Sequence, residues 1–397
     1  MTLLAQLRRF MRIQGSWQLL LAMLAYGCGI GVLQPMNAIY LRDGIHLSKL
    51  EISAVVSIAT VVNMGVTFFS GLWSDRIRRR KRLPLIASLC CAGGLIGYYH
   101  AAGFPAALGF YILSTTPAGI IAGQLYAMAR SHFTQDAPDI VELGIVWLRT
   151  VMSAGFFFGL LLGAELFTLI SFHGVILGNL VCYLLLFAVF LGYREREGTG
   201  VVAPRPAGMP IQWLVLFAIL LILCCDSIRG LYFPLMVNAL FKNPTLVSHL
   251  WSVQVIFEFI WMTLGGVAAE RYGALRVVRW SGLAALFVYF VYALHPALPW
   301  LFAVQPVYSF FVSVESTVVM GVVQRMFLHR TGFGSSLFFV LNQSAALVGF
   351  MVPNLIPGFS PHIFYLPAAL MTVSLVLVSI RLRLNARAAA RAEDLAM

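Results

Sequence analysis

The chain has 397 residues, of which 60% are hydrophobic and only 11% are charged, and its mean hydropathy is +0.88. A soluble globular domain carries roughly one quarter charged residues, so this composition excludes a soluble fold and indicates an integral membrane protein. The formal net charge is +12, and its meaning depends on where the basic residues lie.

Apolar stretches of about 20 residues, long enough to cross a hydrocarbon core of about 30 Å, follow one another along the sequence. We expect each to form an α-helix, because lipid cannot satisfy free backbone groups and the stretches lack the alternation of a membrane barrel. The sequence therefore predicts an all-α integral membrane protein with twelve transmembrane helices. Their ranges are 16–40, 50–73, 83–101, 106–130, 140–164, 172–193, 211–240, 249–269, 276–295, 299–324, 333–356 and 361–382.

The basic residues are unevenly distributed between alternate connections. One side of the predicted membrane holds 22 of the 27 lysines and arginines, and the opposite side holds three. By the positive-inside rule, this predicts that both termini face the cytoplasm. We therefore attribute the basic excess to topology and to contact with anionic membrane lipids, and we expect no nucleic acid as a partner.

Two segments of the chain repeat a pattern at an offset of 195 residues. Residues 71–82 read GLWSDRIRRRKR and residues 266–276 read GVAAERYGALR, each with a glycine, three residues, an acid and an arginine. Further matches at similar offsets predict two six-helix halves, 1–193 and 211–397, joined by a polar cytoplasmic linker at 194–210. Transporters built from such repeats place their substrate site between the repeats, near the membrane midplane.

The loop after the second predicted helix resembles the cytoplasmic loop signature of the major facilitator superfamily. That signature has Gly, three residues, Asp, Arg, any residue, Gly and then basic residues, although Arg78 replaces the second glycine here. We interpret it as a conformational latch, in which an acid at a helix end interacts with arginine and helix dipoles. An equally favoured alternative is that the basic residues of this loop form a solvated surface and only set the orientation of the protein in the membrane. The candidate latch residues are Gly71, Asp75, Arg76, Gly266, Glu270 and Arg271.

Four stretches look like helices of the bacterial sugar efflux transporters, which are proton-linked exporters of lactose-like disaccharides and glycosides. They read AMARSHFTQDAPDIVELGIVWLRTVMSAG, LCCDSIRGLYFPLMV, FEFIWMTLGGVAAERYGALR and HRTGFGSSLFFVLNQS. This resemblance implies a secondary active transporter that exports sugars or sugar-like small molecules by antiport with protons. Exporters of drugs, siderophores or amino acids would share the same features and stay open as alternatives, as does a membrane sensor that transports nothing.

Five charged residues lie well inside predicted helices, away from the helix ends, where each costs about 2.5 to 3.5 kcal/mol on insertion, so we treat them as functional candidates. Asp226 and Arg229 lie three residues apart on one helix face, and we predict a local ion pair that keeps Asp226 charged. Glu258 has no basic residue nearby in its own helix, so burial would favour its protonated form. We predict Glu258 as the proton-coupling residue, with Asp226 and Glu315 as further candidates. If Arg149, the fifth charge, approaches Glu258 from the other half, it would instead favour the ionised form of Glu258.

Polar side chains form one-sided stripes on several predicted helices, which indicates a wet cavity between the halves. Amides, one carboxylate and one guanidinium suit a neutral, hydroxyl-rich ligand, and aromatic rings could stack on sugars. For the amides, an interhelical hydrogen bond of about 0.6 kcal/mol is an equal alternative. The predicted substrate-binding residues are Gln34, Asn37, Asn63, Tyr126, Arg149, Arg229, Gln254, Trp261, Asn342 and Gln343.

The sequence contains no pattern that indicates catalysis. A membrane enzyme would need a nucleophile beside a base, or a metal cluster, and neither the six cysteines nor the eight histidines have metal-ligand spacing. We therefore expect a transporter of a small-molecule substrate with no enzymatic activity, no metal and no cofactor. The coupling ion is expected to be the proton, and the protein is expected to be a monomer.

Overall fold

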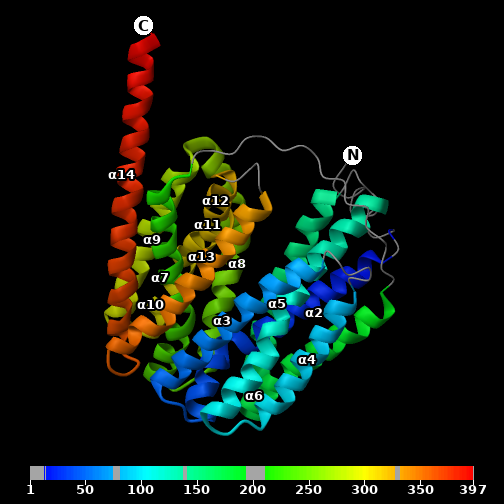
Figure 1. Cartoon of the computed structure of the whole chain (residues 1–397). Coiled ribbons are helices and arrows are strands. Elements are labelled where there is room, and N and C mark those ends of the chain that lie inside the picture. The colour runs from blue at the N-terminus through cyan, green and yellow to red at the C-terminus, as the bar shows by residue number, and fades with distance from the viewer. Residues whose placement is uncertain are drawn as a thin grey trace. The chain divides into compact units, whose positions relative to one another are not determined.

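The computed structural model describes residues 13, 15–74, 81–136, 141–193, 211–326 and 331–396 (Figure 1). Within these ranges the secondary structure is helical, with no β-strand. The prediction of an all-α membrane protein is therefore confirmed for the described part of the chain.

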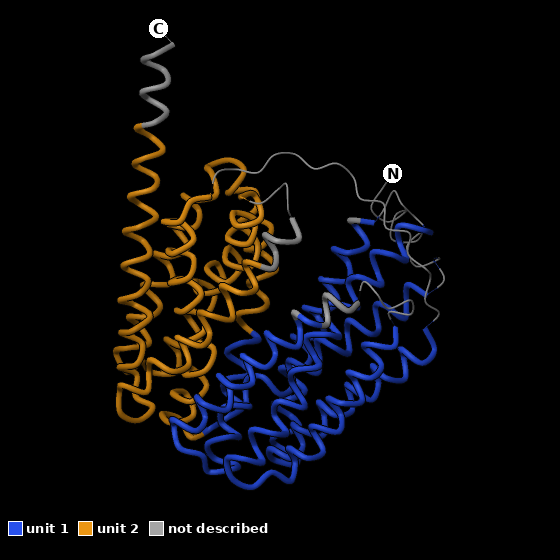
Figure 2. Tube along the Cα trace, viewed as in Figure 1, with its two compact units in different colours: residues 1–202, 243–252 blue, residues 203–242, 253–397 orange. Residues whose placement is uncertain are grey.

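The chain forms two compact units (Figure 2). The first comprises residues 1–202 together with 243–252, and the second comprises residues 203–242 together with 253–397. Because residues 243–252 group with the first unit and the linker at 194–210 lies outside the described residues, the predicted halves 1–193 and 211–397 stay a prediction.

The helices of the first unit follow the predicted apolar stretches closely. The chain turns from the first helix into the next through a short π-helical segment at Tyr40–Gly44. The helices are α2 (Ser16–Ile39), α3 (Lys49–Ser74), α4 (Arg82–Tyr99), α5 (Gly103–Asp136) and α6 (Val141–Gly192).

Helix α6 contains two of the predicted spans. It has 52 residues, and a straight helix of that length would be about 78 Å long, more than twice the thickness of a hydrocarbon core. The chain leaves the helical conformation at Ser171, where φ is 62° and ψ is −155°. Eleven stretches of the described residues are long and apolar enough to cross a membrane. The predicted twelve are reached only when the two arms of α6 are counted separately.

Glycines bring α2 and α6 into backbone contact in the first unit. A Cβ atom added at Gly27 or Gly31 on α2 would collide with a backbone carbonyl of α6, and one added at Gly155 or Gly159 on α6 would collide with a carbonyl of α2. Such small residues let transmembrane helices approach closely, where van der Waals packing replaces the hydrophobic effect.

The second unit contains one long predicted span that is divided into shorter segments. The range 299–324 is occupied by α10 (Leu298–Ala303), α11 (Gln305–Val314), a π-helical turn (Glu315–Val319) and α12 (Met320–Met326). The remaining helices are α7 (Trp213–Phe241), α8 (Thr245–Tyr272), α9 (Ala274–Ala293), α13 (Thr331–Met351) and α14 (Tyr365–Ala396), with 3₁₀ turns at Val352–Leu355 and Pro361–Phe364. The first residues of α8, up to 252, group with the first unit.

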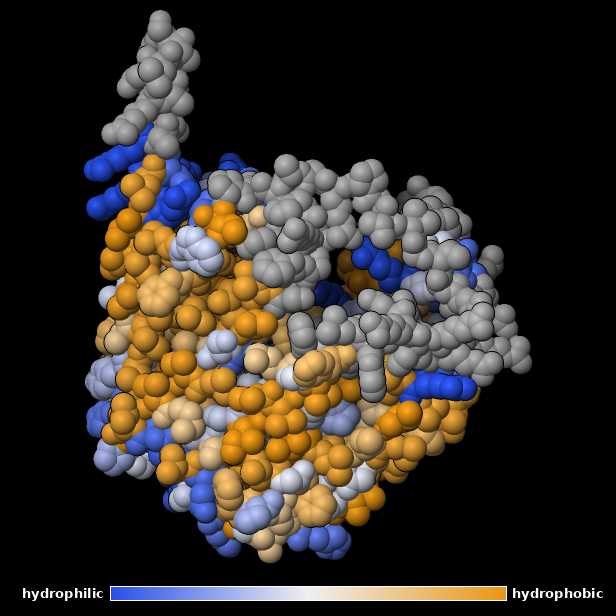
Figure 3. Space-filling view, viewed as in Figure 1, coloured by the Kyte–Doolittle hydropathy of each residue, from blue (hydrophilic) through white to orange (hydrophobic). Residues whose placement is uncertain are grey.

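On the face shown in Figure 3, the described surface is mainly apolar along the flanks of the helices, and most of the strongly hydrophilic residues lie toward the helix ends. Large hydrophobic side chains are widely exposed, for example Leu169 at 76% and Phe158 at 59%. A soluble protein rarely exposes extended apolar patches, so these flanks are the surfaces that contact lipid.

Candidate functional site

Three carboxylates and one arginine, each buried or half-buried, meet in the second unit. Asp226 and Arg229 lie on α7, Glu258 lies on α8, and Glu315 begins the π-helical turn after α11. Asp226 and Arg229 interact electrostatically with each other and with Glu258. Glu315 lies within electrostatic range of Asp226 and Glu258. The three residues predicted to couple protons are thus brought into one cluster, which we call the acid cluster.

Arg229 is enclosed by aromatic rings and an amide. It is only 4% exposed, and its guanidinium carbon lies 4.4 Å from the ring centroid of Tyr308 and 4.8 Å from that of Phe233. Its Nη2 donates a hydrogen bond to Oε1 of Gln305 over 3.2 Å. A desolvated cation over aromatic rings is stabilised by about 2 kcal/mol, so this environment can retain a buried charge.

Tyr308 connects the two charges of α7. Its hydroxyl donates a hydrogen bond of 2.8 Å to Oδ1 of Asp226, while its ring lies against the Arg229 guanidinium. The same hydroxyl lies 3.2 Å from that of Tyr289. Asp226 and Arg229 therefore share a neutral partner on α11, and their direct pairing stays a prediction.

Glu258 has a neutral hydrogen-bond donor one helical turn earlier. Nε2 of Gln254 donates to Oε1 of Glu258 over 2.6 Å. Two serines of α11 fix this part of α8, because Ser309 donates to the backbone carbonyl of Gln254 over 2.6 Å and Ser313 donates to that of Glu258 over 3.3 Å. The polar face of α8 is thus held against α11.

Glu315 is the most enclosed of the three acids. Glu315 is 8% exposed, and its Oε2 has no hydrogen-bond partner among the described residues. A buried, unsatisfied carboxylate oxygen is costly unless the group carries a proton. The π-helical turn that begins at Glu315 is a backbone feature that occurs frequently at functional sites.

The other predicted binding residues of the second unit contribute mainly to helix packing. Nε1 of Trp261 donates to the backbone carbonyl of Pro306 over 3.0 Å, and its ring lies 5.0 Å from that of Phe310. The indole N–H is therefore already used in joining α8 to α11. Asn342 and Gln343 lie half-buried on α13.

The amides predicted on α2 and α3 of the first unit have different surroundings. Gln34 is exposed, whereas Asn37 is buried and accepts a hydrogen bond of 2.9 Å from the hydroxyl of Tyr98 on α4. The hydrogen bond between Tyr98 and Asn37 joins α4 to α2, which is the alternative role predicted for the amides in place of ligand contact. Asn63 accepts a hydrogen bond of 2.9 Å from Thr67, one turn later on α3.

Tyr126 and Arg149 face each other between α5 and α6. The guanidinium carbon of Arg149 lies 6.0 Å from the ring centroid of Tyr126, and the hydroxyl of Tyr126 donates to Sδ of Met152 over 3.6 Å. Arg149 is exposed, so its charge is available to a ligand. It belongs to the first unit and Glu258 to the second, so their predicted pairing stays a prediction.

Only one copy of the predicted latch lies fully within the described residues. Gly71 lies on α3, and Asp75 and Arg76 of the first copy fall outside the described residues. Glu270 and Arg271 are exposed at the end of α8, and Gly266 is half-buried one turn before them.

A glycine ends the second copy of the latch. Gly273, between α8 and α9, has a φ of 89°, a conformation that glycine adopts without steric cost. The tight turn expected from the signature is thus formed in this copy. The guanidinium carbon of Arg271, just before the turn, lies 5.3 Å from the ring centroid of Tyr272.

Sequence reasoning missed Gln305 and Tyr308, which contact Arg229 and Asp226. Neutral side chains carry no insertion penalty comparable to a charge, so they did not stand out. The signal that could have found them is the spacing of Gln305, Tyr308, Ser309 and Ser313, which gives a polar stripe along one helix face.

A multi-pass bundle of apolar helices with a buried cluster of charges defines a membrane transport protein. Residues 19–350 match the family model of the Major Facilitator Superfamily, and the chain belongs to this superfamily. It is therefore a non-enzymatic transporter, embedded in the membrane, with a small molecule as its substrate. The resemblance found in the loop after the second predicted helix is confirmed.

One relative and two solved structures illustrate this membership. A protein of Deinococcus radiodurans named "Putative sugar efflux transporter" is 24% identical over 379 residues, which cover 91% of this chain and 95% of the relative. The crystal structure of the nucleoside transporter NupG covers 92% of this chain and 98% of its own, with a TM-score of 0.74 at 15% identity. The peptide transporter POT in complex with sulfate covers 93% and 94%, with a TM-score of 0.77 at 14% identity. At these identities the two structures show the fold alone.

Proposed function

We propose that this protein exports sugars or sugar-like small molecules from the cytoplasm by antiport with protons. The relative from Deinococcus radiodurans, which bears a sugar efflux name and aligns over nearly the whole chain, supports the substrate class. The protein would lie in a bacterial inner membrane as a monomer, with both termini in the cytoplasm, as the distribution of 22 of its 27 basic residues favours.

The acid cluster is the observation that carries the proposal of proton coupling. Asp226, Glu258 and Glu315 are close enough to interact, and Arg229 is the cation that interacts with this group. If all three acids were ionised, the cluster would bury an excess of two negative charges. An uncompensated buried charge is strongly destabilising, and a bound proton removes it.

Glu258 is the best candidate for the exchanging proton. Its carboxylate accepts from the neutral amide of Gln254, so it can gain or lose a proton without breaking a strong ionic contact. Asp226 is held by the hydroxyl of Tyr308 beside Arg229, which ties its charge to a structural network. Proton binding at Glu258 would bias the protein toward one of two access states, and substrate would favour the other.

The candidate substrate-binding residues include polar side chains of each unit. Arg149 and Tyr126 in the first unit offer an exposed guanidinium and an aromatic ring, and Asn342 and Gln343 in the second offer half-buried amides. Such groups suit hydroxyl-rich ligands. The alternatives are exporters of drugs, siderophores or amino acids, and the nucleoside and peptide transporters among the structural neighbours show that one fold serves different substrates.

Transport in proteoliposomes tests both parts of the proposal. With an imposed pH gradient, we expect labelled disaccharides to be transported, whereas labelled amino acids and amphiphilic drugs are not. Glu258→Gln should abolish pH-driven transport and retain exchange of substrate for substrate, because it removes the proton site and keeps the side-chain shape. The matched control is Glu165→Gln, since Glu165 is an exposed acid on α6 outside the acid cluster.

Two outcomes would contradict the proposal. Transport of amino acids or drugs in place of sugars would overturn the substrate class. A pH-driven rate in Glu258→Gln equal to that of the unmodified protein would overturn the assignment of the coupling residue, and Asp226 would be the next to test.

A further inference from the structure

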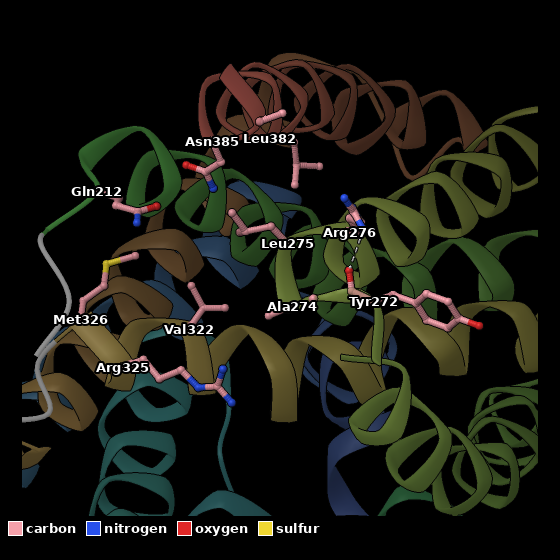
Figure 4. Close-up of a pocket in the computed structure, with 12 residues that line it drawn as sticks. Gln212, Tyr272, Ala274, Leu275, Arg276, Val322, Arg325, Met326, Leu382 and Asn385 are labelled. Carbon is pink, nitrogen blue, oxygen red and sulfur yellow. Dashed lines mark hydrogen bonds between the residues drawn. The ribbon is translucent and has the colours of Figure 1, made fainter. Parts of the chain in front are cut away.

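A pocket of about 520 Å³ lies in the second unit, and no residue of the acid cluster lines it (Figure 4). It is formed where α8 ends and α9 begins, beside the end of α12, the start of α7 and the side of α14. Its lining includes Gln212, Tyr272, Leu275, Arg276, Val322, Arg325 and Ala386.

The lining of this pocket is amphipathic. Leu275 and Val322 belong to an apolar wall contributed by α9 and α12, while Arg276 and Arg325 bring one guanidinium from each of the same two helices (Figure 4). Both arginines are exposed. Arg276 donates one hydrogen bond, 3.5 Å long, to the backbone carbonyl of Tyr272, which at that length is weak. The two cations are thus available to an anionic group beside an apolar surface.

Aromatic side chains indicate the depth of the pocket in the membrane. Trp213 follows the lining residue Gln212 and is 74% exposed, and Trp280 is 39% exposed. The ring of Trp280 lies 5.4 Å from that of Tyr272, which lines the pocket and is 43% exposed. Exposed Trp and Tyr are typical of the level of the lipid headgroups. The pocket therefore opens where headgroups meet acyl chains.

The surroundings of the pocket are rich in positive charge. Arg271 at the end of α8, and Arg383 and Arg387 on α14, are exposed close in sequence to the lining residues. In a bilayer, each lysine or arginine near an anionic membrane surface contributes about 1 kcal/mol to the attraction of that surface, so these arginines would concentrate anionic lipid around the pocket without contacting a lipid bound in it. A zwitterionic lipid or a neutral amphiphile would not use these charges.

We propose that this pocket binds an anionic phospholipid, with its phosphate at Arg276 and Arg325 and its acyl chains on the apolar wall. A lipid held there would join the end of α8, the start of α9, the end of α12 and the side of α14, and would stabilise the helix arrangement seen in this structure. The proposal does not depend on which substrate is exported or on the role of Glu258.

Lipid binding to the purified full-length protein in detergent can be measured by native mass spectrometry. The probes are phosphatidylglycerol and phosphatidylethanolamine with the same acyl chains. We expect retention of phosphatidylglycerol in preference to phosphatidylethanolamine. The double variant Arg276→Gln/Arg325→Gln should weaken phosphatidylglycerol binding roughly 30-fold, which follows from the loss of two such charge contacts.

Two further variants separate the pocket from general surface charge. Arg383→Gln/Arg387→Gln removes the same charge from exposed positions on α14 that do not line the pocket, and it should change binding less than threefold. Ala386→Trp, at an exposed lining position, keeps both arginines and fills the pocket, and it should also prevent lipid retention. That result would show that the apolar cavity is needed in addition to the charges.

Three results would overturn the proposal. The first is equal weakening in the two double-arginine variants, which would indicate diffuse attraction. The second is equal retention of the two lipids. The third is competition by glycerol 3-phosphate or inorganic phosphate at concentrations as low as those of the lipid, which would assign the pocket to a free phosphate compound.

Discussion

Asp226 and Arg229 illustrate how charges inside a membrane protein are stabilised by neutral neighbours. Tyr308 donates a hydrogen bond to the acid and presents its ring to the base, and Gln305 accepts a hydrogen bond from the base. Tyr308 and Gln305 thus satisfy part of the hydrogen bonding and charge of Asp226 and Arg229. The two charged side chains therefore do not depend on a single direct contact with each other. This explains how a helix that is otherwise apolar can contain both charges.

A double-mutant cycle measures how strongly Asp226 and Arg229 depend on each other. We expect Asp226→Asn to lower the free energy of unfolding by about 3 kcal/mol, because it leaves Arg229 buried without its acid. Adding Arg229→Gln should recover part of this loss, since residues in one network have coupling energies of about 0.5 to 3 kcal/mol. Denaturant unfolding in detergent micelles provides the measurement.

The matched control for this cycle is the partly exposed pair Arg42 and Asp43, whose side chains approach to 3.3 Å. Arg42→Gln and Asp43→Asn should each change stability by no more than about 1 kcal/mol, as is typical of surface pairs. If the effects of Asp226→Asn and Arg229→Gln simply add, the two residues are not coupled.

The charged members of the site could be predicted from the sequence, but their partners could not. Asp226, Glu258 and Glu315 stood out because an ionised group in a helix centre is expensive, and the structure brings them together. Tyr308 is one of 14 tyrosines, and its role depends on α7 and α11 being adjacent. That adjacency arises from tertiary packing, which periodicity within one helix does not reveal.

At the scale of elements, glycine positions determine which helices can touch. The contact of α2 with α6 depends on glycines on both helices that face backbone carbonyls. The sequence contained this pattern as Gly155, Gly159 and Gly163, spaced four residues apart, but spacing alone does not identify the partner helix. The structure identifies it as α2.

Adding one methyl group to a contact glycine tests this packing. Gly159→Ala should lower the melting temperature, because its Cβ would collide with the backbone carbonyl of Cys28, which cannot move aside as a side chain can. Gly123→Ala is the control, since a Cβ there meets no described atom within 4 Å. That change should leave the melting temperature unchanged or raise it, because alanine favours helices by up to about 1 kcal/mol over glycine.

The informative result is a lower melting temperature for Gly159→Ala together with an unchanged or higher melting temperature for Gly123→Ala. The thermal unfolding of each purified variant in the same detergent can be followed by circular dichroism. If both variants lost the same stability, or if both gained it, close contact between α2 and α6 would not be what stabilises the first unit.

At the scale of the whole molecule, the helix inventory was largely predictable because membrane insertion imposes a simple rule of length and hydropathy. The predicted range 211–240 became α7 (Trp213–Phe241), and 276–295 became α9 (Ala274–Ala293). Interruptions of the helix within one membrane span were harder to predict from the sequence. The π-helical turn at Glu315–Val319 depends on local backbone geometry, and the sequence indicated a single continuous helix there.

The orientation in the membrane follows from the same charge distribution and can be tested with cysteine labelling. Asn243→Cys, between α7 and α8, should react with a membrane-impermeant maleimide in intact cells, whereas Arg383→Cys on α14 should react only after permeabilisation, since both positions are exposed. The unmodified protein, whose six cysteines are free and buried or half-buried, gives the background labelling. Labelling of Arg383→Cys in intact cells would reverse the topology. It would also show that the basic excess does not set orientation here, because nearly all of the basic residues in the connections lie on the side of Arg383.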